Sequence, residues 1–115
     1  MDIFHIVDRS DWEKAKEKGT YHPVSLDNEG FIHFSKADQI LEVANNFYKG
    51  QATLLILRVD SSKLNAELKV EPPLEAPFSG ILYPHLYGDL NIDSVESEIE
   101  FPCREDGSFA LPELF

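Results

Sequence analysis

Residues 53–59 read Thr-Leu-Leu-Ile-Leu-Arg-Val, an almost continuously apolar stretch in which Arg58 is the only charged residue. A strand with one face in water alternates apolar and polar residues, whereas a strand covered on both faces is apolar along its length. The stretch therefore predicts the central strand of a sheet that is packed on both sides.

The neighbouring segments predict a helix before this strand, and a strand and a loop after it. Residues 40–48 place apolar side chains, Phe47 among them, at the three-four spacing of one buried helix face, and Gly50 ends the helix. Residues 67–71 alternate as a half-exposed strand does. Residues 72–80 contain three prolines and one glycine, which predicts a loop that could act as a lid.

The rest of the chain predicts one earlier helix and several short strands. Ser10 and Glu13 have capping-box spacing at the start of that helix, and Gly19 is placed to end it. Residues 21–26 are expected to be irregular. Strands are expected over residues 3–7, 31–34, 81–83 and 95–101, the last at a sheet edge. Because two helices come early and strands dominate later, the order favours an α+β domain over a doubly wound parallel sheet.

Length and charge restrict the classes of function. A chain of 115 residues fits one domain, so residues 1–115 are expected to form a single unit. Ten Lys and Arg against 21 Asp and Glu give a formal net charge of −11. Nucleic acids and anionic membranes are bound through basic patches, and the sequence shows none. We therefore expect neither as a partner; the oligomeric state stays open.

Cysteine content and hydropathy bear on the compartment. Cys103 is the single cysteine, so an intrachain disulfide and a cysteine-based zinc cluster are both excluded. No apolar stretch approaches the ~20 residues that cross a bilayer, and the first residues lack the pattern of a secretory signal. A reducing, cytoplasmic location is the expectation.

Three of the four histidines have unusual surroundings. His5 and His33 lie within apolar strands, and His85 lies in a segment rich in aromatic residues, Tyr-Pro-His-Leu-Tyr-Gly. A histidine in an apolar strand costs burial free energy unless it is hydrogen-bonded. Each could be a satisfied core histidine, but together they indicate a polar cleft. His22 is assigned to the surface.

Five further side chains carry a functional interpretation beside a structural one. Ser35 is expected to cap the following helix, and the same helix start with Lys36 could hold an anion. Glu71 is either a solvated carboxylate at a strand end or an acid at the mouth of a cleft. Tyr83 and Tyr87 are either core aromatics or stacking faces for a planar ring.

In these residues the chain resembles an uncharacterised family, the Domain of Unknown Function 952. The matching segments span residues 4–88, and Phe34 stands where the family often has Cys. They are Phe4-His5-Ile6, Trp12 with Ala15, Glu-Gly-Phe-Ile-His-Phe-Ser at residues 29–35, Gln39, and Pro-His-Leu-Tyr-Gly at residues 84–88.

The resemblance implies a fold similar to the ADP-ribosyltransferase catalytic domain, with two small sheets around a cleft and two early helices. By that analogy His5 would contact the ribose on the nicotinamide side, with His33 and Ser35 nearby. Glu71 or His85 would stabilise an oxocarbenium-like transition state. A shared fold does not by itself imply a shared activity.

Three hypotheses follow. The first is binding of NAD or an ADP-ribose-type nucleotide in a histidine-lined cleft, with possible ADP-ribosyltransferase-like turnover. In it, His5, Ser35, Lys36, Tyr83 and Tyr87 bind the nucleotide, and His5, His33, Glu71 and His85 are the catalytic candidates. The second is a non-catalytic module that binds a small metabolite. The third is a zinc site built from His5, His33 and His85, although close ligand spacing is missing.

Overall fold

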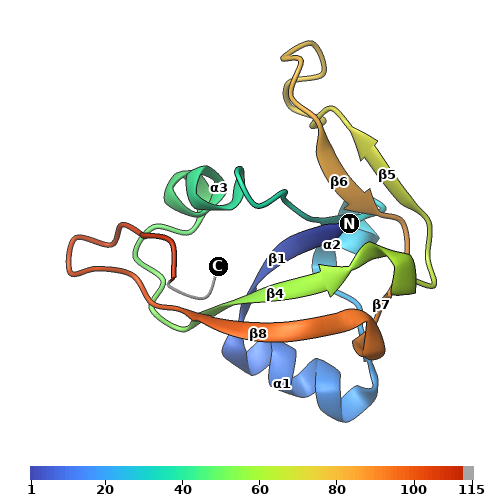
Figure 1. Ribbon diagram of the computed structural model, residues 1–115, viewed down its shortest axis with the longest axis horizontal. Helices are drawn as coiled ribbons and strands as arrows, with labels where there is room; N and C mark the ends of the chain where they lie inside the picture. The colour runs from blue at the N-terminus through green and yellow to red at the C-terminus, as the bar shows by residue number, and fades with distance from the viewer. Residues whose placement is uncertain (113–115) are drawn as a thin grey trace.

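A computed structural model describes residues 1–112 and shows a small, compact, mixed α+β domain (Figure 1). Its largest sheet joins β1 (Asp2–Asp8), β4 (Leu54–Asp60) and β8 (Val95–Phe101) in the antiparallel order β1-β4-β8. The predicted central strand is therefore confirmed as β4, and the predicted edge strand as β8. Within the described residues there are three small antiparallel sheets, where the family resemblance implied two.

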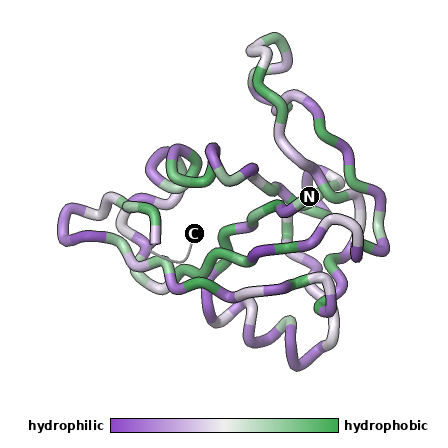
Figure 2. Tube along the Cα trace, viewed as in Figure 1, coloured by the Kyte–Doolittle hydropathy of each residue, from purple (hydrophilic) through white to green (hydrophobic). Residues whose placement is uncertain are grey.

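Strand β4 is apolar over residues 54–57 because each of its faces lies in a different core. Leu55 and Leu57 point into a core that also holds Trp12 from the first helix. Leu54 and Ile56 point into a second core on the opposite face. The hydropathy colouring of Figure 2 shows the consequence, a green band along the middle of the sheet.

Helix α1 (Arg9–Lys18) follows β1 directly. Its N-cap is Asp8, whose side chain accepts a hydrogen bond from the Ser10 amide, so the expected Ser10 cap is wrong by two positions. Gly19 ends the helix in the left-handed conformation at φ 90°, as predicted, because this backbone geometry costs glycine least. Residues 21–26 are not irregular: they include part of β2 (Thr20–Tyr21) and of α2 (Val24–Asn28).

Two smaller sheets complete the fold. Strand β2 pairs with β7 (Leu90–Asn91), and β6 (Tyr83–Leu86) lies between β3 (Ile32–His33) and β5 (Leu68–Glu71). Both β3 and β6 differ from expectation, since β3 is shorter than residues 31–34 and β6 begins where the predicted strand was to end. A short 3-10 helix, η1 (Ser61–Lys63), follows β4, and a second, η2 (Ile92–Ser94), precedes β8.

Ser35 does not cap a helix. Its amide donates to the Phe4 carbonyl and its carbonyl accepts from the Phe4 amide, so residue 35 extends the edge of the main sheet. Helix α3 (Ile40–Phe47) begins later, and the Gln39 side chain accepts from the Lys36 amide at the preceding turn. The anion site predicted at a Ser35–Lys36 helix start therefore has no helix N-terminus beneath it. Phe47 is also exposed instead of buried.

The loop between β5 and β6 projects from the body of the domain, away from α1 (Figure 1). Phe78 at this loop is 99% exposed, so its ring takes no part in the core. At the other end of the molecule, Phe109 is buried and its ring stacks on Phe101 at 4.7 Å. Among the described residues, no helix has both the length and the apolar character needed to span a bilayer.

Candidate functional site

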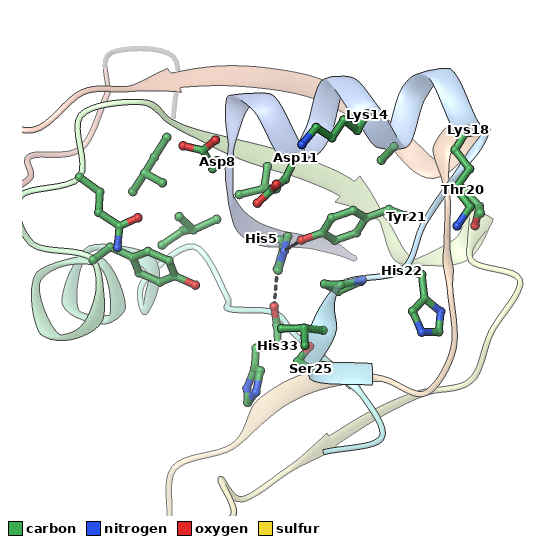
Figure 3. A pocket seen from close by; sticks show the side chains of 18 residues that line it. His5, Asp8, Asp11, Lys14, Lys18, Thr20, Tyr21, His22, Ser25 and His33 are labelled. Carbon is green, nitrogen blue, oxygen red and sulfur yellow. Dashed lines mark hydrogen bonds between the residues drawn. The ribbon is translucent and has the colours of Figure 1, made fainter. Parts of the chain in front are cut away.

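A cavity of about 580 Å³ opens beside β1, between α1 and the segment that carries β2 and the start of α2 (Figure 3). Its size falls within the range of small-molecule sites. Tyr48, Gln51 and Leu54 complete the lining. The polar and charged side chains of its central part are those of His5, Asp8, Asp11, Lys14, Lys18, Tyr21, His22, Ser25 and His33.

His5 lies at the inner side of this cavity and is only 8% exposed. Its Nδ1 lies 2.6 Å from the His33 carbonyl oxygen, and its Nε2 lies 2.8 Å from the Tyr21 hydroxyl (Figure 3). Its ring also contacts the Phe34 ring, with a centroid distance of 5.3 Å. Burial lowers the pKa of His5 to about 4, because a charged imidazole would lose its hydration. His5 is therefore neutral at physiological pH.

Tyr21 is the partner of His5 and is itself buried. Gly19 turns the chain at the end of α1, and the pairing of Tyr21 with Leu90 then holds the backbone in place. The Trp12 ring meets the Tyr21 ring edge-on at 6.0 Å. Burial raises the pKa of Tyr21 far above its usual value, so the side chain remains a phenol that can donate its single hydrogen.

Charged groups surround the cavity. Asp8 accepts hydrogen bonds from Ser10 and Thr53, and these bonds lower the pKa of its carboxyl group. Lys14 and Lys18 stand on the α1 wall, and within residues 1–112 neither forms an ion pair. In a chain with a net charge of −11, two free ammonium groups at one wall favour an anionic ligand group there.

His22 is exposed, as the sequence predicted, and it also lines the cavity. Its Nδ1 pairs with Asp89 and its Nε2 with Asp27, the latter at 2.9 Å. The hydrogen bonds to these carboxylates raise the pKa of His22. Both ring nitrogens are occupied, so His22 serves to hold the segment after β2 in place.

A second polar cluster lies on the outer face of the β3-β6-β5 sheet. His85 is 2% exposed, and its Nδ1 lies 2.9 Å from the Glu71 carboxylate. The Tyr87 hydroxyl donates to the same carboxylate oxygen. These two bonds lower the pKa of Glu71, and the bond to Glu71 raises the pKa of Tyr87 to about 12. Phe31 covers the His85 ring at a stacking distance of 4.0 Å.

The register of the sheet brings two predicted histidines together. His33 and His85 are directly opposite each other on β3 and β6, and their ring centroids are 5.7 Å apart. The His33 ring is held by Glu29, while the His33 carbonyl accepts from His5 on the other side. His33 therefore joins the cavity to the outer cluster.

The predicted site residues fall into two groups. His5 and His33 line the cavity, whereas Ser35, Lys36, Glu71, Tyr83, His85 and Tyr87 do not. In the part of the chain that the structure describes, no group of three or more His, Cys, Asp or Glu side chains could hold a metal ion. The loop of residues 72–80 does not line the cavity either.

Sequence reasoning missed the side chains that give the cavity its polarity, chiefly Tyr21 and the two lysines on α1. Lys14 and Lys18 are four residues apart on one helix face, a spacing that predicts a shared direction. Tyr21 follows the helix-ending Gly19 and stands beside His22, a position typical of a chain turning back toward the sheet. Neither signal specifies a cavity without the three-dimensional arrangement.

Comparisons with known proteins give a family match and similar solved structures. Residues 6–98 match the family described as "Protein of unknown function (DUF952)". The crystal structure of protein CC0527 from Caulobacter crescentus is similar, with 34% identity, a TM-score of 0.81, and coverage of 96% of this chain and 95% of that one. The solution NMR structure of the same protein gives 34% identity, a TM-score of 0.76, and coverage of 92% and 89%. Curated proteins provide no match.

Proposed function

The chain belongs to the DUF952 family of proteins of unknown function, and we propose that its cavity binds a small nucleotide of the NAD or ADP-ribose type. The observation that carries this proposal is the neutral His5–Tyr21 pair on the inner side of a cavity whose α1 wall holds two unpaired lysines. One region offers uncharged hydrogen-bonding groups, and the other offers two ammonium groups beside the carboxylates of Asp8 and Asp11.

This division matches the chemistry of a nucleotide. Ribose hydroxyls and a carboxamide are neutral groups that a tyrosine or histidine can bind without transferring charge into a buried site. Phosphates carry the negative charge that Lys14 and Lys18 would neutralise. A cavity of about 580 Å³ has room for a nucleoside with its phosphate groups at the open end.

The finer proposal is a transfer reaction of the ADP-ribosyltransferase type, in which the bond from ribose to nicotinamide breaks and the same ribose carbon forms a bond to water or to another nucleophile. Breaking the bond between nicotinamide and ribose places positive charge on the ribose, and a nearby carboxylate would stabilise that charge. Asp8 and Asp11 line the cavity and could supply it. Glu71 and His85 could act only on a ligand that reaches the outer cluster, because neither lines the cavity.

Non-catalytic binding of a small metabolite remains the second candidate. It is favoured by the position of Glu71, the acid expected from the family resemblance, which is bonded to Tyr87 and His85 outside the cavity. The two candidates differ in the fate of the ligand. Chromatography of NAD after incubation would show free nicotinamide for the transferase, and unchanged NAD for the binding module.

Calorimetric titration with NAD, ADP-ribose and nicotinamide tests the binding itself. We expect binding to the wild type and a loss of about tenfold or more in Lys14→Ala/Lys18→Ala, because two ammonium–phosphate contacts are removed. The matched control is Lys49→Ala/Lys63→Ala, which removes the same charge away from the cavity and should bind like the wild type.

The proposal fails if none of these ligands binds the wild type, or if the two double variants lose affinity equally. The second result would mean that only the overall charge of the protein matters. Thermal unfolding of each variant, measured without ligand, shows whether it is folded under the conditions of the titration.

A further inference from the structure

We propose that Tyr21 selects ligands by accepting a hydrogen bond, so that the cavity requires a hydroxyl or N–H donor at this position. This inference rests on the proposed function and adds to it a specificity-determining residue. It starts from one contact, the 2.6 Å approach of His5 Nδ1 to the His33 carbonyl oxygen.

The first step concerns the proton on His5. A backbone carbonyl oxygen can only accept, so Nδ1 must carry the hydrogen in this contact. A neutral imidazole has one N–H, which leaves Nε2 with a lone pair. The His33 carbonyl of β3 therefore determines the tautomer of His5, and this oxygen remains an acceptor at every pH.

The second step is that His5 is neutral. The groups packed against its ring are the Tyr21 phenol, the Phe34 ring and the His33 backbone, and none of them carries a negative charge. No carboxylate in the described residues is hydrogen-bonded to His5. The low pKa of His5, about 4, agrees with this arrangement.

The third step concerns the direction of the hydrogen bond between His5 and Tyr21. Because His5 Nε2 can only accept, the Tyr21 hydroxyl must donate across the 2.8 Å contact. The single phenolic hydrogen is then used. No other group within residues 1–112 is hydrogen-bonded to this hydroxyl, so the Tyr21 oxygen keeps unused acceptor capacity beside the cavity.

The chemical consequence is a preference between similar ligands. A ribose hydroxyl or the NH₂ of a carboxamide can donate to the Tyr21 oxygen. A carbonyl, ether, carboxylate or phosphate oxygen at the same place would leave two acceptors facing each other. Sites built to bind a polar group discriminate strongly against analogues that lack it, because a buried polar atom is then left unpaired.

Nitrogen-15 NMR of the imidazole rings tests the first three steps without any ligand. At pH 7 we expect His5 as the neutral Nδ1–H form, with an unprotonated Nε2. The His5 signals are assigned by their disappearance in His5→Gln. A spectrum showing His5 protonated at Nε2 would overturn the inference, because Tyr21 would then have to accept from His5.

A ligand series tests the selection. The series compares NAD with its nicotinic acid analogue, in which a carboxylate replaces the carboxamide, and with analogues lacking one ribose hydroxyl at a time. We expect at least one analogue to bind the wild type about tenfold more weakly than NAD. In Tyr21→Phe that same difference should disappear, because the acceptor is gone. In Tyr83→Phe, whose residue lies outside the cavity, the difference should persist.

The outcomes separate this inference from the proposed function. If NAD binds but every analogue binds equally well, or if the discrimination survives in Tyr21→Phe, the role of Tyr21 is wrong and the nucleotide site stands. If no nucleotide binds the wild type, the proposed function fails and the selection fails with it, whatever tautomer the NMR spectrum reports.

Discussion

His5 shows how one side chain can combine a structural and a chemical role. On β1 it occupies a position whose neighbours face the core, and its two hydrogen bonds offset the free-energy cost of burying an imidazole. The same bonds determine which nitrogen holds the proton. Burial lowers the pKa of His5 from 6.5 to about 4, while hydrogen bonds to two carboxylates raise the pKa of the exposed His22.

The first prediction concerns acid stability. Between pH 6.5 and about 4 the unfolded chain binds a proton at His5 that the folded chain does not, so the free energy of unfolding falls as the pH falls. At about 1.4 kcal/mol for each pH unit, the loss approaches about 3 kcal/mol. Urea unfolding of the wild type and His5→Gln, followed by fluorescence across this range, should show a loss that is larger in the wild type by about this amount.

His22→Gln is the control of opposite sign. The raised pKa of His22 gives a stabilisation that is fully present below its unfolded pKa and is lost as the pH rises through its folded pKa. Removing His22 should therefore destabilise the protein at low pH more than at high pH. Parallel pH profiles for the wild type and His5→Gln would contradict the burial argument for His5.

The second prediction concerns the outer cluster. Tyr87→Phe removes a hydrogen bond to Glu71, so the pKa of Glu71 should rise toward its usual value, and the free energy of unfolding should fall by about 1 kcal/mol. Carbon-13 NMR titration of the Glu71 carboxyl group measures the pKa directly. Tyr83→Phe lies on β6, and the Tyr83 side chain has no hydrogen bond to Glu71, so this substitution should leave the pKa of Glu71 unchanged. Equal shifts of the Glu71 pKa in both variants would show that the Tyr87 hydrogen bond is not what lowers it.

At the scale of elements, the junction after β6 depends on close packing between two chain segments. Gly88 follows Tyr87, and a Cβ atom added to it would lie 2.7 Å from the Cβ atom of Ala66, which precedes β5. This distance is far below van der Waals contact. Glycine is required here by the space available, because its φ does not lie in the left-handed region.

The third prediction follows from this contact. Gly88→Ala should reduce the free energy of unfolding by about 1–3 kcal/mol, as overpacking does in other proteins. When the same substitution is made in an Ala66→Gly background it should have little effect, because the opposing atom is absent. Chemical denaturation of the four proteins forms a double-mutant cycle. An equal loss in both backgrounds would mean that the Ala66 contact is not the cause.

At the scale of the whole molecule, β4 joins two cores that would otherwise be separate. The core on the α1 side supports the cavity through Trp12 and Tyr21, and the other core holds α3 and Phe109 against the sheet. Both cores contain side chains of β4, a strand of seven residues. Residues of both cores line the cavity, since Tyr21 belongs to the first core and Ile6 and Leu54 belong to the second.

The fourth prediction tests this coupling. Leu57→Ala and Ile56→Ala each truncate a fully buried side chain, on opposite faces of β4, and each should cost about 2–5 kcal/mol. Trp12 fluorescence reports only on the core of Leu57, and far-ultraviolet circular dichroism reports on the whole chain. Both probes should give one shared transition in both variants. A Trp12 transition that is unaffected by Ile56→Ala would show that the cores unfold separately.

Sequence patterns were sufficient where the decisive forces are local. The nearly continuous apolar run at residues 53–59 predicted a central strand with both faces buried, because such a run is typical of a strand between two cores. The end of α1 at Gly19 and the alternation of the edge strand β8 were also predicted. The three histidines with apolar or aromatic neighbours predicted a polar cleft, and two of them, His5 and His33, line the cavity.

Tertiary structure decided the features that depend on distant partners. Ser35 has the sequence of a helix cap, but its backbone pairs with Phe4, because β1 brings amide and carbonyl groups within reach that the local chain lacks. The meeting of His33 with His85 follows from strand register, which periodicity leaves open. Tyr21 belongs to the site because packing places its hydroxyl beside the lone pair of His5. The two residues are sixteen positions apart in the sequence, so local patterns do not reveal this hydrogen bond.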